Sequence, residues 1–300
     1  MNAAGADVRD TKVIASGLYL EGLAVDYGRD LVWYSDCIAG GVHGVRPDGT
    51  PVFSLNPERM WTGGIMMNAD GAVLSSGPGG IMWNRPEDGT RGWLIREVDG
   101  KPLIGVNEMT PDGSGGIYFG TVDVEQIEKG EQTRPALLYH LSASGEVRLA
   151  TGPVGFANGL MRSLDGTRLF FNDTFDATYV FDILDDGLLG ERRCLLKKED
   201  CDGMAMDGDG NVLVTGYKSG SIVRMAPDGS ILGMLDTPAD AVTQLRFGGA
   251  DLCDVYFNCV PLDAGDGLKE GEAPTEQRSF LMRGRVNRPG LAIAPAQFTL

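Results

Sequence analysis

Asp-Gly pairs recur along the chain between short apolar segments. A tight turn between antiparallel strands needs a residue at positive φ, and glycine adopts that conformation without steric cost, so each such pair predicts a β-hairpin. The apolar segments are strand-length and rich in β-branched and aromatic residues, and none keeps a helical period over three turns. The chain is therefore predicted to be a succession of hairpins, with turns at Asp48-Gly49, Asp70-Gly71, Asp88-Gly89, Asp112-Gly113, Asp165-Gly166, Asp209-Gly210 and Asp228-Gly229.

These strands and turns form a repeated unit. Residues 22–49 and 203–229 follow the same order of strands and turns, and residues 159–182 form a weaker third copy. Four short strands in about 40 to 50 residues are typical of one β-propeller blade. Six such units fit the 300 residues, and blades close one shared ring. The sequence therefore predicts an all-β, six-bladed β-propeller with a central metal-binding channel, forming a single domain over 1–300.

Four segments lie outside the copies of the repeat. Residues 1–12, approximately, are expected to be a short N-terminal extension, and the Pro- and Gly-rich stretch at about 262–278 an exposed loop. Ser279–Arg285 is expected to supply a strand to the final blade. The polar segment Val122–Arg134 predicts a loop or one short helix, and its place near the expected channel opening makes it a candidate lid.

Composition excludes several classes of partner. The chain carries 42 acidic and 26 basic residues, a net charge of -16, which would repel phosphate backbones and anionic lipid surfaces. We therefore expect a small-molecule partner, neither nucleic acid nor membrane, and composition leaves the oligomeric state open. The early charges at Asp7, Arg9 and Asp10 are unlike a secretory signal, so a cytoplasmic protein is expected. Five cysteines without a C-x-x-C pair indicate neither a disulfide framework nor a zinc knuckle.

Common catalytic signatures are missing from the sequence. It contains no Gly-x-Ser-x-Gly elbow and no Gly-rich phosphate loop, and its two histidines, His43 and His140, leave few ways to build a nucleophile with a histidine base. The spacing of Asp207, Asp209 and Asn211 is similar to that of a calcium loop. Val212 stands where glycine should make the sharp turn, so a hairpin is the better interpretation.

Three polar residues stand directly in front of blade-opening strands, each followed by glycine: Glu21, Asn158 and Asp202. In a propeller the first strand of every blade lines the axis, so equivalent positions in different blades converge. Two carboxylates and an amide oxygen suit a divalent cation that keeps open positions for water and substrate. The alternative is that each residue only caps its strand or satisfies turn amides.

The sequence resembles the regucalcin/gluconolactonase family, also called the senescence-marker-protein family. The resemblance lies in Glu21-Gly-Leu-Ala, Asn107-Glu-Met-Thr-Pro-Asp-Gly, Asn158-Gly-Leu-Met-Arg, Phe171-Asn-Asp-Thr174, Asp202-Gly-Met-Ala-Met-Asp and Phe247-Gly-Gly-Ala-Asp251. It implies a lactone hydrolase with one divalent metal held by Glu21, Asn158 and Asp202: calcium first, with zinc, manganese or iron(II) as alternatives. It further implies that Asp202 is the general base and that Asn107 faces the substrate or metal.

One departure from the family bears on the substrate. Sugar-lactonase members often carry an arginine two residues before the matching asparagine, where this chain has Gly105. Soft and aromatic residues nearby could form an apolar channel mouth, although inter-blade core is the alternative. They are Met60, Trp61, Met66, Met67, Met82, Trp83 and Met109. We therefore expect a lactone or ester less polar than a sugar lactone, bound by Asn107, Glu108, Trp61 and Met109. Other possibilities are a hydrolase of another ester or a phosphotriester, or a non-catalytic metal- or ligand-binding propeller.

Overall fold

The computed structural model describes residues 8–129, 134–264, 267 and 272–300. Four sheets have four antiparallel strands each, in chain order. The first two are β2 (Leu20–Asp26), β3 (Leu31–Asp36), β4 (Val42–Val45) and β5 (Pro51–Leu55), then β6 (Ile65–Met67), β7 (Val73–Gly77), β8 (Gly80–Asn84) and β9 (Arg91–Ile95). The other two are β12 (Val106–Pro111), β13 (Ile117–Thr121), β14 (Ala136–Leu141) and β15 (Val147–Val154), then β16 (Phe156–Arg162), β17 (Arg168–Thr174), β18 (Ala177–Asp182) and β19 (Arg193–Lys197).

A larger sheet of eight strands completes the ring. Its members are β20 (Cys201–Met206), β21 (Val212–Gly216), β22 (Ser219–Met225), β23 (Ile231–Asp236), β24 (Ala241–Gly248), β25 (Asp254–Val260), β26 (Ser279–Arg285) and β1 (Arg9–Gly17). Its two halves, β20–β23 and β24–β26 with β1, meet between β21 and β24 through the pair Gly216 and Val242. The predicted strand Ser279–Arg285 is confirmed. Its partner β1 was not foreseen and begins within the expected N-terminal extension of residues 1–12.

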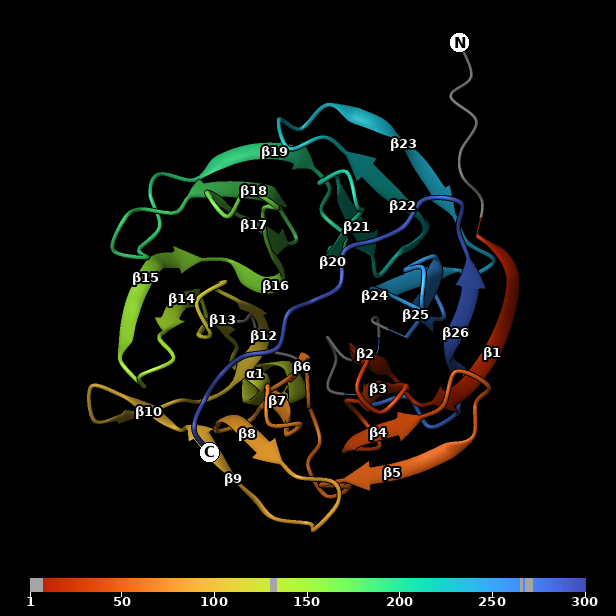
Figure 1. Cartoon of the computed structure of the whole chain (residues 1–300), viewed down its shortest axis with the longest axis horizontal. Coiled ribbons are helices and arrows are strands. Elements are labelled where there is room, and N and C mark those ends of the chain that lie inside the picture. The colour runs from red at the N-terminus through yellow and green to blue at the C-terminus, as the bar shows by residue number, and fades with distance from the viewer. Residues whose placement is uncertain (1–7, 130–133, 265–266, 268–271) are drawn as a thin grey trace.

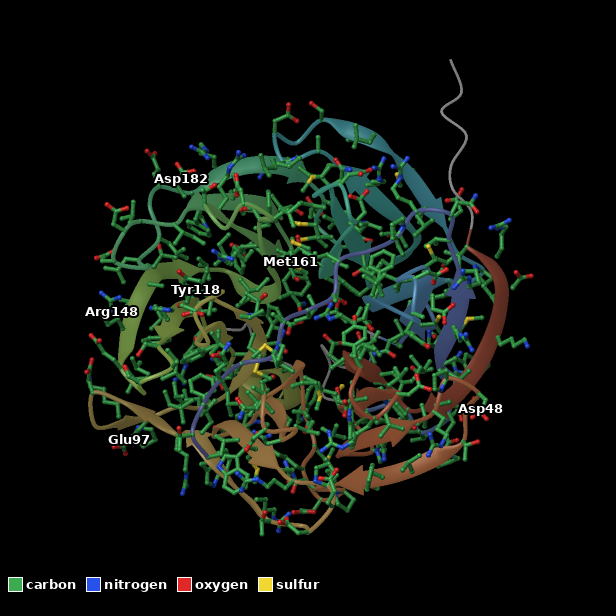
Figure 2. All side chains as sticks on the ribbon, viewed as in Figure 1. Asp48, Glu97, Tyr118, Arg148, Met161 and Asp182 are labelled. Atoms are coloured by element: carbon green, nitrogen blue, oxygen red, sulfur yellow. The ribbon has the colours of Figure 1, made fainter. Side chains whose placement is uncertain are left out.

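Figure 1 shows the sheets arranged around one axis with β2, β6, β12, β16, β20 and β24 innermost. Each of these strands contacts the next, and β24 contacts β2, so the ring is closed by a strand from near each end of the chain. The fold is all-β and propeller-like, as predicted. In Figure 2, charged side chains such as Asp48, Arg148 and Asp182 lie at the periphery, whereas the buried Met161 lies towards the centre.

The Asp-Gly turns are confirmed as predicted. Each of the seven glycines has positive φ, from 72° at Gly89 to 93° at Gly49, and each turn joins two consecutive antiparallel strands. The possible calcium loop is also a hairpin. Asp207 Oδ1 accepts hydrogen bonds from the amides of Asp209 and Asn211, and its other oxygen pairs with Arg224 at 2.7 Å. These contacts occupy the carboxylate within its own turn.

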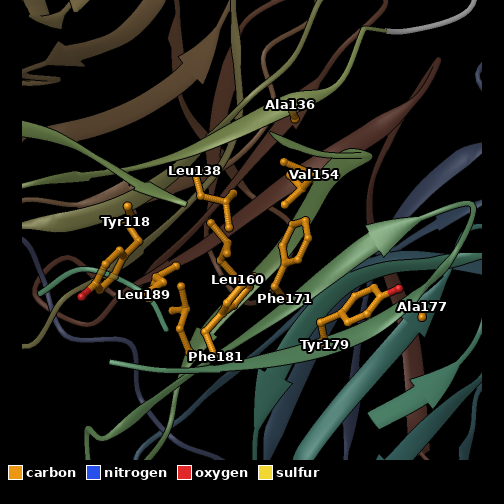
Figure 3. Close-up of a cluster of buried hydrophobic side chains, with 13 residues drawn as sticks. Tyr118, Ala136, Leu138, Val154, Leu160, Phe171, Ala177, Tyr179, Phe181 and Leu189 are labelled. Atoms are coloured by element: carbon orange, nitrogen blue, oxygen red, sulfur yellow. The ribbon is translucent and has the colours of Figure 1, made fainter. Parts of the chain in front are cut away.

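The hydrophobic core lies within and between neighbouring sheets. Figure 3 shows one cluster in which Tyr118 and Leu138 from one sheet meet Leu160, Phe171 and Phe181 from the next. Burial of each such side chain contributes about 1.5–3 kcal/mol. A second cluster contains Met66 and Met109 together with Leu74, Ile81 and Phe119. Met66 and Met109 are 2% and 3% exposed, so both belong to the inter-blade core.

Elements outside the sheets are short. The hairpin of β10 (Glu97–Val98) and β11 (Lys101–Pro102) lies between β9 and β12. Helix α1 (Val124–Glu128), capped by Asp123, occupies part of the segment predicted as a loop or one short helix. Residues 130–133 of the candidate lid, and 265–266 and 268–271 of the expected exposed loop, lie outside the described residues. Among the described helices, none has the length and hydropathy to cross a membrane.

Candidate functional site

The three predicted metal ligands lie at β-bulges of innermost strands. The pairing register shifts between Leu20 and Leu23, between Ala157 and Leu160, and between Cys201 and Met204. A bulge adds one residue to a strand, bends it and changes the direction of its side chains, which is why bulges often occur near active sites. The three predicted ligands therefore lie inside β2, β16 and β20. The sequence had placed them in front of these strands, and the structure corrects this. Similar shifts occur in β12, around Asn107 and Glu108, and in β24.

Glycines beside these residues let neighbouring inner strands approach closely. A Cβ atom on Gly22 would lie 1.9 Å from the carbonyl oxygen of Gly63. One on Gly159 would lie 2.6 Å from the Asp202 carbonyl oxygen, and one on Gly203 2.4 Å from that of Thr243. Real Cβ atoms do not come this near to backbone oxygens, so the glycine after each predicted ligand is required by the close approach of two backbones.

Polar side chains on second strands hold the bulged backbone in place. Asn258 of β25 donates from Nδ2 to the carbonyls of Glu21 and Gly22, at 2.9 and 3.1 Å. Asn172 of β17 donates in the same way to the carbonyls of Asp202 and Gly203, at 2.7 and 3.2 Å. Both asparagines are buried. Neither asparagine is among the site residues predicted from the sequence, although a polar residue at the same place in two apolar strands was a visible signal.

Thr174 connects the elements that carry Asn158 and Asp202. Its hydroxyl donates to the carbonyl of Cys201 at 2.6 Å and accepts a hydrogen bond from Asn158 Nδ2 at 3.0 Å. Asn158 Oδ1 accepts from Asn107 Nδ2 at 2.9 Å, which leaves a second lone pair on that oxygen. The amide of Asn158 is therefore oriented by both neighbours, with its oxygen on the side of Asn107.

Glu21 and Asp202 interact electrostatically, although 181 positions separate them in the chain. Burial, then the charge of Glu108, raises the pKa of Glu21 from 4.5 to about 8. Burial, then the charges of Glu21 and Glu108, raises the pKa of Asp202 well above its ordinary value. The structure thus gathers acidic groups from β2, β12 and β20 around the axis.

The donor set fits a hard divalent cation. Asp202 is 3% exposed, and its Oδ1 is buried with no hydrogen-bond partner. A buried, unpaired carboxylate oxygen is costly unless a cation or donor compensates it. Two carboxylates and an amide oxygen are ligands that such cations accept. No group of three or more His, Cys, Asp or Glu side chains in the described part of the chain could hold a metal. The candidate set therefore depends on the amide oxygen of Asn158.

A buried polar network crosses the ring from β12 to β24. Glu108 of β12 accepts from the amide of Met109 and, through Oε2, from Gln244 Nε2 of β24 at 2.8 Å. Gln244 Oε1 in turn accepts from Arg246 Nη1 at 2.6 Å. Gln244 and Arg246 were not foreseen, because nothing in the sequence places β24 opposite β12. Both carboxylate oxygens of Glu108, a predicted substrate contact, are engaged within the protein.

The other predicted substrate contacts occupy different surroundings. Asn107 is half-buried, and its Nδ2 donates to the Ala157 carbonyl and to Asn158 Oδ1, both at 2.9 Å. Trp61 is half-buried against the cluster of Tyr19, Cys37 and neighbouring residues. The Trp61 N–H donates to the Cys37 carbonyl at 2.5 Å, and the Cys37 N–H donates to the Tyr19 carbonyl at 2.9 Å, so Trp61 lies beside the segment that leads into β2. Met109 is buried in the core and stays outside the candidate site.

The raised pKa of Glu21 predicts that the metal-free protein loses stability as the pH rises. Because the pKa moves from 4.5 to about 8 on folding, the folded state holds this proton more tightly than the unfolded chain does. The resulting stabilisation is complete below pH 4.5 and is lost as the pH rises through about 8. In chelator, we expect the melting temperature to fall across this window.

Glu21→Gln is the matched variant for this measurement, because it keeps the shape of the side chain and removes the titrating group. Its melting temperature in chelator should depend less on pH than that of the wild type. An equal pH dependence in the two proteins would contradict the assignment of the effect to Glu21.

Comparisons with known proteins identify the family of this chain. The family model described as "SMP-30/Gluconolactonase/LRE-like region" matches residues 20–259. Pentonolactonase XacC of Haloferax volcanii is 26% identical over 251 residues, which cover 81% of this chain and 82% of that protein. Regucalcin of Sus scrofa is 31% identical over 169 residues, which cover 54% of this chain and 55% of regucalcin. That second match thus spans about half of either protein.

Solved structures share the fold over nearly the whole chain. A calcium-binding protein, regucalcin, of Agrobacterium tumefaciens superposes with a TM-score of 0.80 and 18% identity, covering 98% of this chain and all of that one. A gluconolactonase of Xanthomonas campestris gives a TM-score of 0.75 and 20% identity, covering 95% and 93% of the two chains. The family match runs from β2 to β25 and includes all three bulges that carry Glu21, Asn158 and Asp202, so the chain belongs to the SMP-30/gluconolactonase/LRE-like family.

Proposed function

We propose that this protein is a lactonase that opens its substrate by attack of water beside one divalent cation, calcium, held by Glu21, Asn158 and Asp202. The observation that carries the proposal is the buried, unpaired Oδ1 of Asp202 together with its electrostatic interaction with the half-buried carboxylate of Glu21. Excess negative charge without a neighbouring donor favours a bound cation. Relatives named pentonolactonase and gluconolactonase support the reaction, and one named a calcium-binding protein supports the ion.

The proposed architecture is a six-bladed propeller with the cation in its channel. The four separate four-stranded sheets supply four blades. The two halves of the eight-stranded sheet supply the fifth and sixth, because a single residue pair joins β21 to β24. β1 then pairs with β26 and completes the last blade with a strand from the start of the chain. Six inner strands contacting in sequence support this count.

In this proposal Asp202 is the general base. When bound, the cation would polarise the lactone carbonyl and make a nearby water more acidic. Asp202 would help to hold the cation with one carboxylate oxygen, and its other oxygen would accept the proton as the water oxygen bonds to the carbonyl carbon. The bond between that carbon and the ring oxygen then breaks, and the proton passes from Asp202 to the departing alkoxide. Hydroxy acid is the product, and no covalent intermediate forms.

Asn107 and Glu108 take supporting roles. Both Nδ2 hydrogens of Asn107 are used by Ala157 and Asn158, so the group that it offers towards the centre is its amide oxygen. That oxygen would accept a hydrogen bond from the attacking water or from a substrate hydroxyl. Glu108, held by Gln244 and by the Met109 amide, would add negative charge beneath the cation without touching the substrate.

Elemental analysis combined with a panel of lactones tests the proposal. Protein purified without chelator is expected to contain one divalent cation per chain and to hydrolyse lactones. Chelator should remove both the metal and the activity, and calcium should restore them. Glu21→Gln should bind the cation more weakly, whereas Glu97→Gln, which changes an exposed carboxylate of β10, should behave like the wild type. Hydrolysis that survives complete loss of the metal would contradict the mechanism.

A further inference from the structure

Five aromatic residues lie at or near the ends of the inner strands and of the strands next to them. Tyr19 and Phe156 lie two residues before Glu21 and Asn158 on β2 and β16, and Trp61 lies two residues before Gly63. Phe175 and Tyr217 directly follow β17 and β21, strands that support or adjoin the bulges. We call this set, Tyr19, Trp61, Phe156, Phe175 and Tyr217, the aromatic arc.

Ring contacts connect the members of the arc. Phe156 and Phe175 meet edge to face with centroids 5.8 Å apart, and Phe175 meets Tyr217 in the same manner at 6.1 Å. Phe175 directly follows Thr174, whose hydroxyl accepts a hydrogen bond from Asn158 Nδ2 at 3.0 Å, so these three rings adjoin the proposed cation site. Cys37 connects the other two members, because its N–H donates to the Tyr19 carbonyl at 2.9 Å and its carbonyl accepts from the Trp61 N–H at 2.5 Å. Tyr19 directly precedes β2, the strand that carries Glu21.

The arc keeps aromatic surface accessible at some conformational cost. Phe175 is 49% exposed, and Trp61, Phe156 and Tyr217 are half-buried. Phe175 has φ of 76° and Trp61 has φ of 55°, a region that bulky residues rarely adopt. Such backbone persists at functional sites where the side chain is needed in that place. A half-exposed phenylalanine gains little from burial, so its role is better explained by contact with a ligand.

The positions two residues before Asn107 and Asp202 carry either no side chain or one that already has hydrogen-bond partners in the protein. Gly105, two residues before Asn107, offers no side chain, and a Cβ there would lie 2.9 Å from the carbonyl oxygen of Val122. Asp200, two residues before Asp202, accepts from Lys198 Nζ at 2.7 Å and from Ser219 Oγ at 2.8 Å. Neither position is arranged to bind several hydroxyl groups of a sugar.

We propose that the lactone substrate carries an aromatic ring, which the arc binds while the lactone carbonyl lies at the cation. This inference rests on the proposed function and narrows it to aryl-substituted lactones. Rings contribute offset and edge-to-face contacts that an alkyl group cannot reproduce. The preference for aryl-substituted lactones is therefore expected to appear in substrate binding, and so in KM. The value of kcat is expected to depend on the cation and Asp202.

Three lactones of one ring size test the substrate class on the metal-loaded protein: a phenyl-substituted lactone, the methyl-substituted equivalent and an aldonolactone. The phenyl compound should have the highest kcat/KM. Phe156→Leu and Phe175→Leu keep an apolar side chain and remove the ring, and each should lower the phenyl-to-methyl ratio about 3- to 10-fold through KM. Phe53→Leu is the matched control, because Phe53 is half-buried and stacked on Trp33 at 5.6 Å but lies on the outer strand β5, and it should leave the ratio unchanged.

Equilibrium binding of the corresponding phenyl lactam, which is not hydrolysed as a lactone is, gives a readout independent of turnover. Its affinity should fall in Phe156→Leu and Phe175→Leu and persist in Phe53→Leu. If the aldonolactone is preferred and neither arc variant changes the ratio, the substrate class is wrong and the lactonase proposal stands. If the metal-loaded protein hydrolyses none of the three lactones, the proposed function fails. In that case lactam binding alone tests whether the aromatic arc binds an aromatic ring. Equal affinity in the wild type and all variants would overturn that inference.

Discussion

Asp202→Asn is expected to lower kcat about 10²- to 10⁴-fold, the range typical of losing a general base. Asparagine has nearly the same shape as aspartate and keeps one oxygen for the cation, but it cannot accept the proton of the attacking water. The change also removes the negative charge of the buried Asp202, which interacts unfavourably with that of Glu21, so the metal-free variant should be no less stable than the wild type. The measurements are initial rates on a lactone, metal content and melting temperature.

Asp200→Asn is the matched control for this prediction. Asp200 lies two residues earlier, and its carboxylate is engaged by Lys198 and Ser219. This variant should retain most of the turnover and bind the metal normally. Equal activity in Asp202→Asn and the wild type, at equal metal content, would refute the assignment of the base.

Gly22→Ala is expected to destabilise the protein by at least about 3 kcal/mol, towards the upper end of what overpacking costs. The added Cβ would lie 1.9 Å from the carbonyl oxygen of Gly63, so β2 and the backbone before β6 must separate. Glu21 lies in the same bulge, and its carboxylate would move with the backbone. Urea unfolding and metal titration should therefore both show a loss.

Gly28→Ala provides the comparison, because it adds the same methyl group in an exposed turn. Its Cβ would lie 3.5 Å from Asp26 Oδ1, an ordinary contact, and the backbone there is not in the left-handed region. A change of stability within about 0.5 kcal/mol is expected. If Gly22→Ala were equally mild, close approach of the inner strands would not be what requires glycine after Glu21.

The repeat predicted the local structure well because the signals are local. A tight hairpin turn needs a residue at positive φ wherever it occurs, and the glycines of all seven predicted Asp-Gly turns have it. Segments such as Leu31–Ser35 and Asp254–Asn258 became strands because they are buried on both faces of the sheet, which suits their β-branched and aromatic side chains. The strand β1 was missed because its pattern is mostly exposed, and it is a strand chiefly through its pairing with β26, far away in sequence.

The candidate site likewise has residues that could be predicted from the sequence and contacts that could not. Glu21, Asn158 and Asp202 could be selected from the sequence because the repeat places each before a glycine at equivalent positions. Their interaction partners could not. Gln244 reaches Glu108 across 136 positions, and Asn258 reaches Glu21 across 237, because ring closure brings those strands together. For the methionines, the structure corrects a prediction made from the sequence. Their number near Asn107 indicated an apolar channel mouth, whereas packing places Met66 and Met109 in the core.

By itself, then, the sequence determined the strands, their turns and the polar positions that recur with the repeat, since each depends on neighbours only a few residues away. Only the tertiary structure decided which of those positions meet, which oxygen of Asp202 lacks a partner, and how Phe156, Phe175 and Tyr217 come into contact. The physical reason is ring closure. A propeller places its functional groups by the contacts between blades, and those contacts join residues that no local pattern connects.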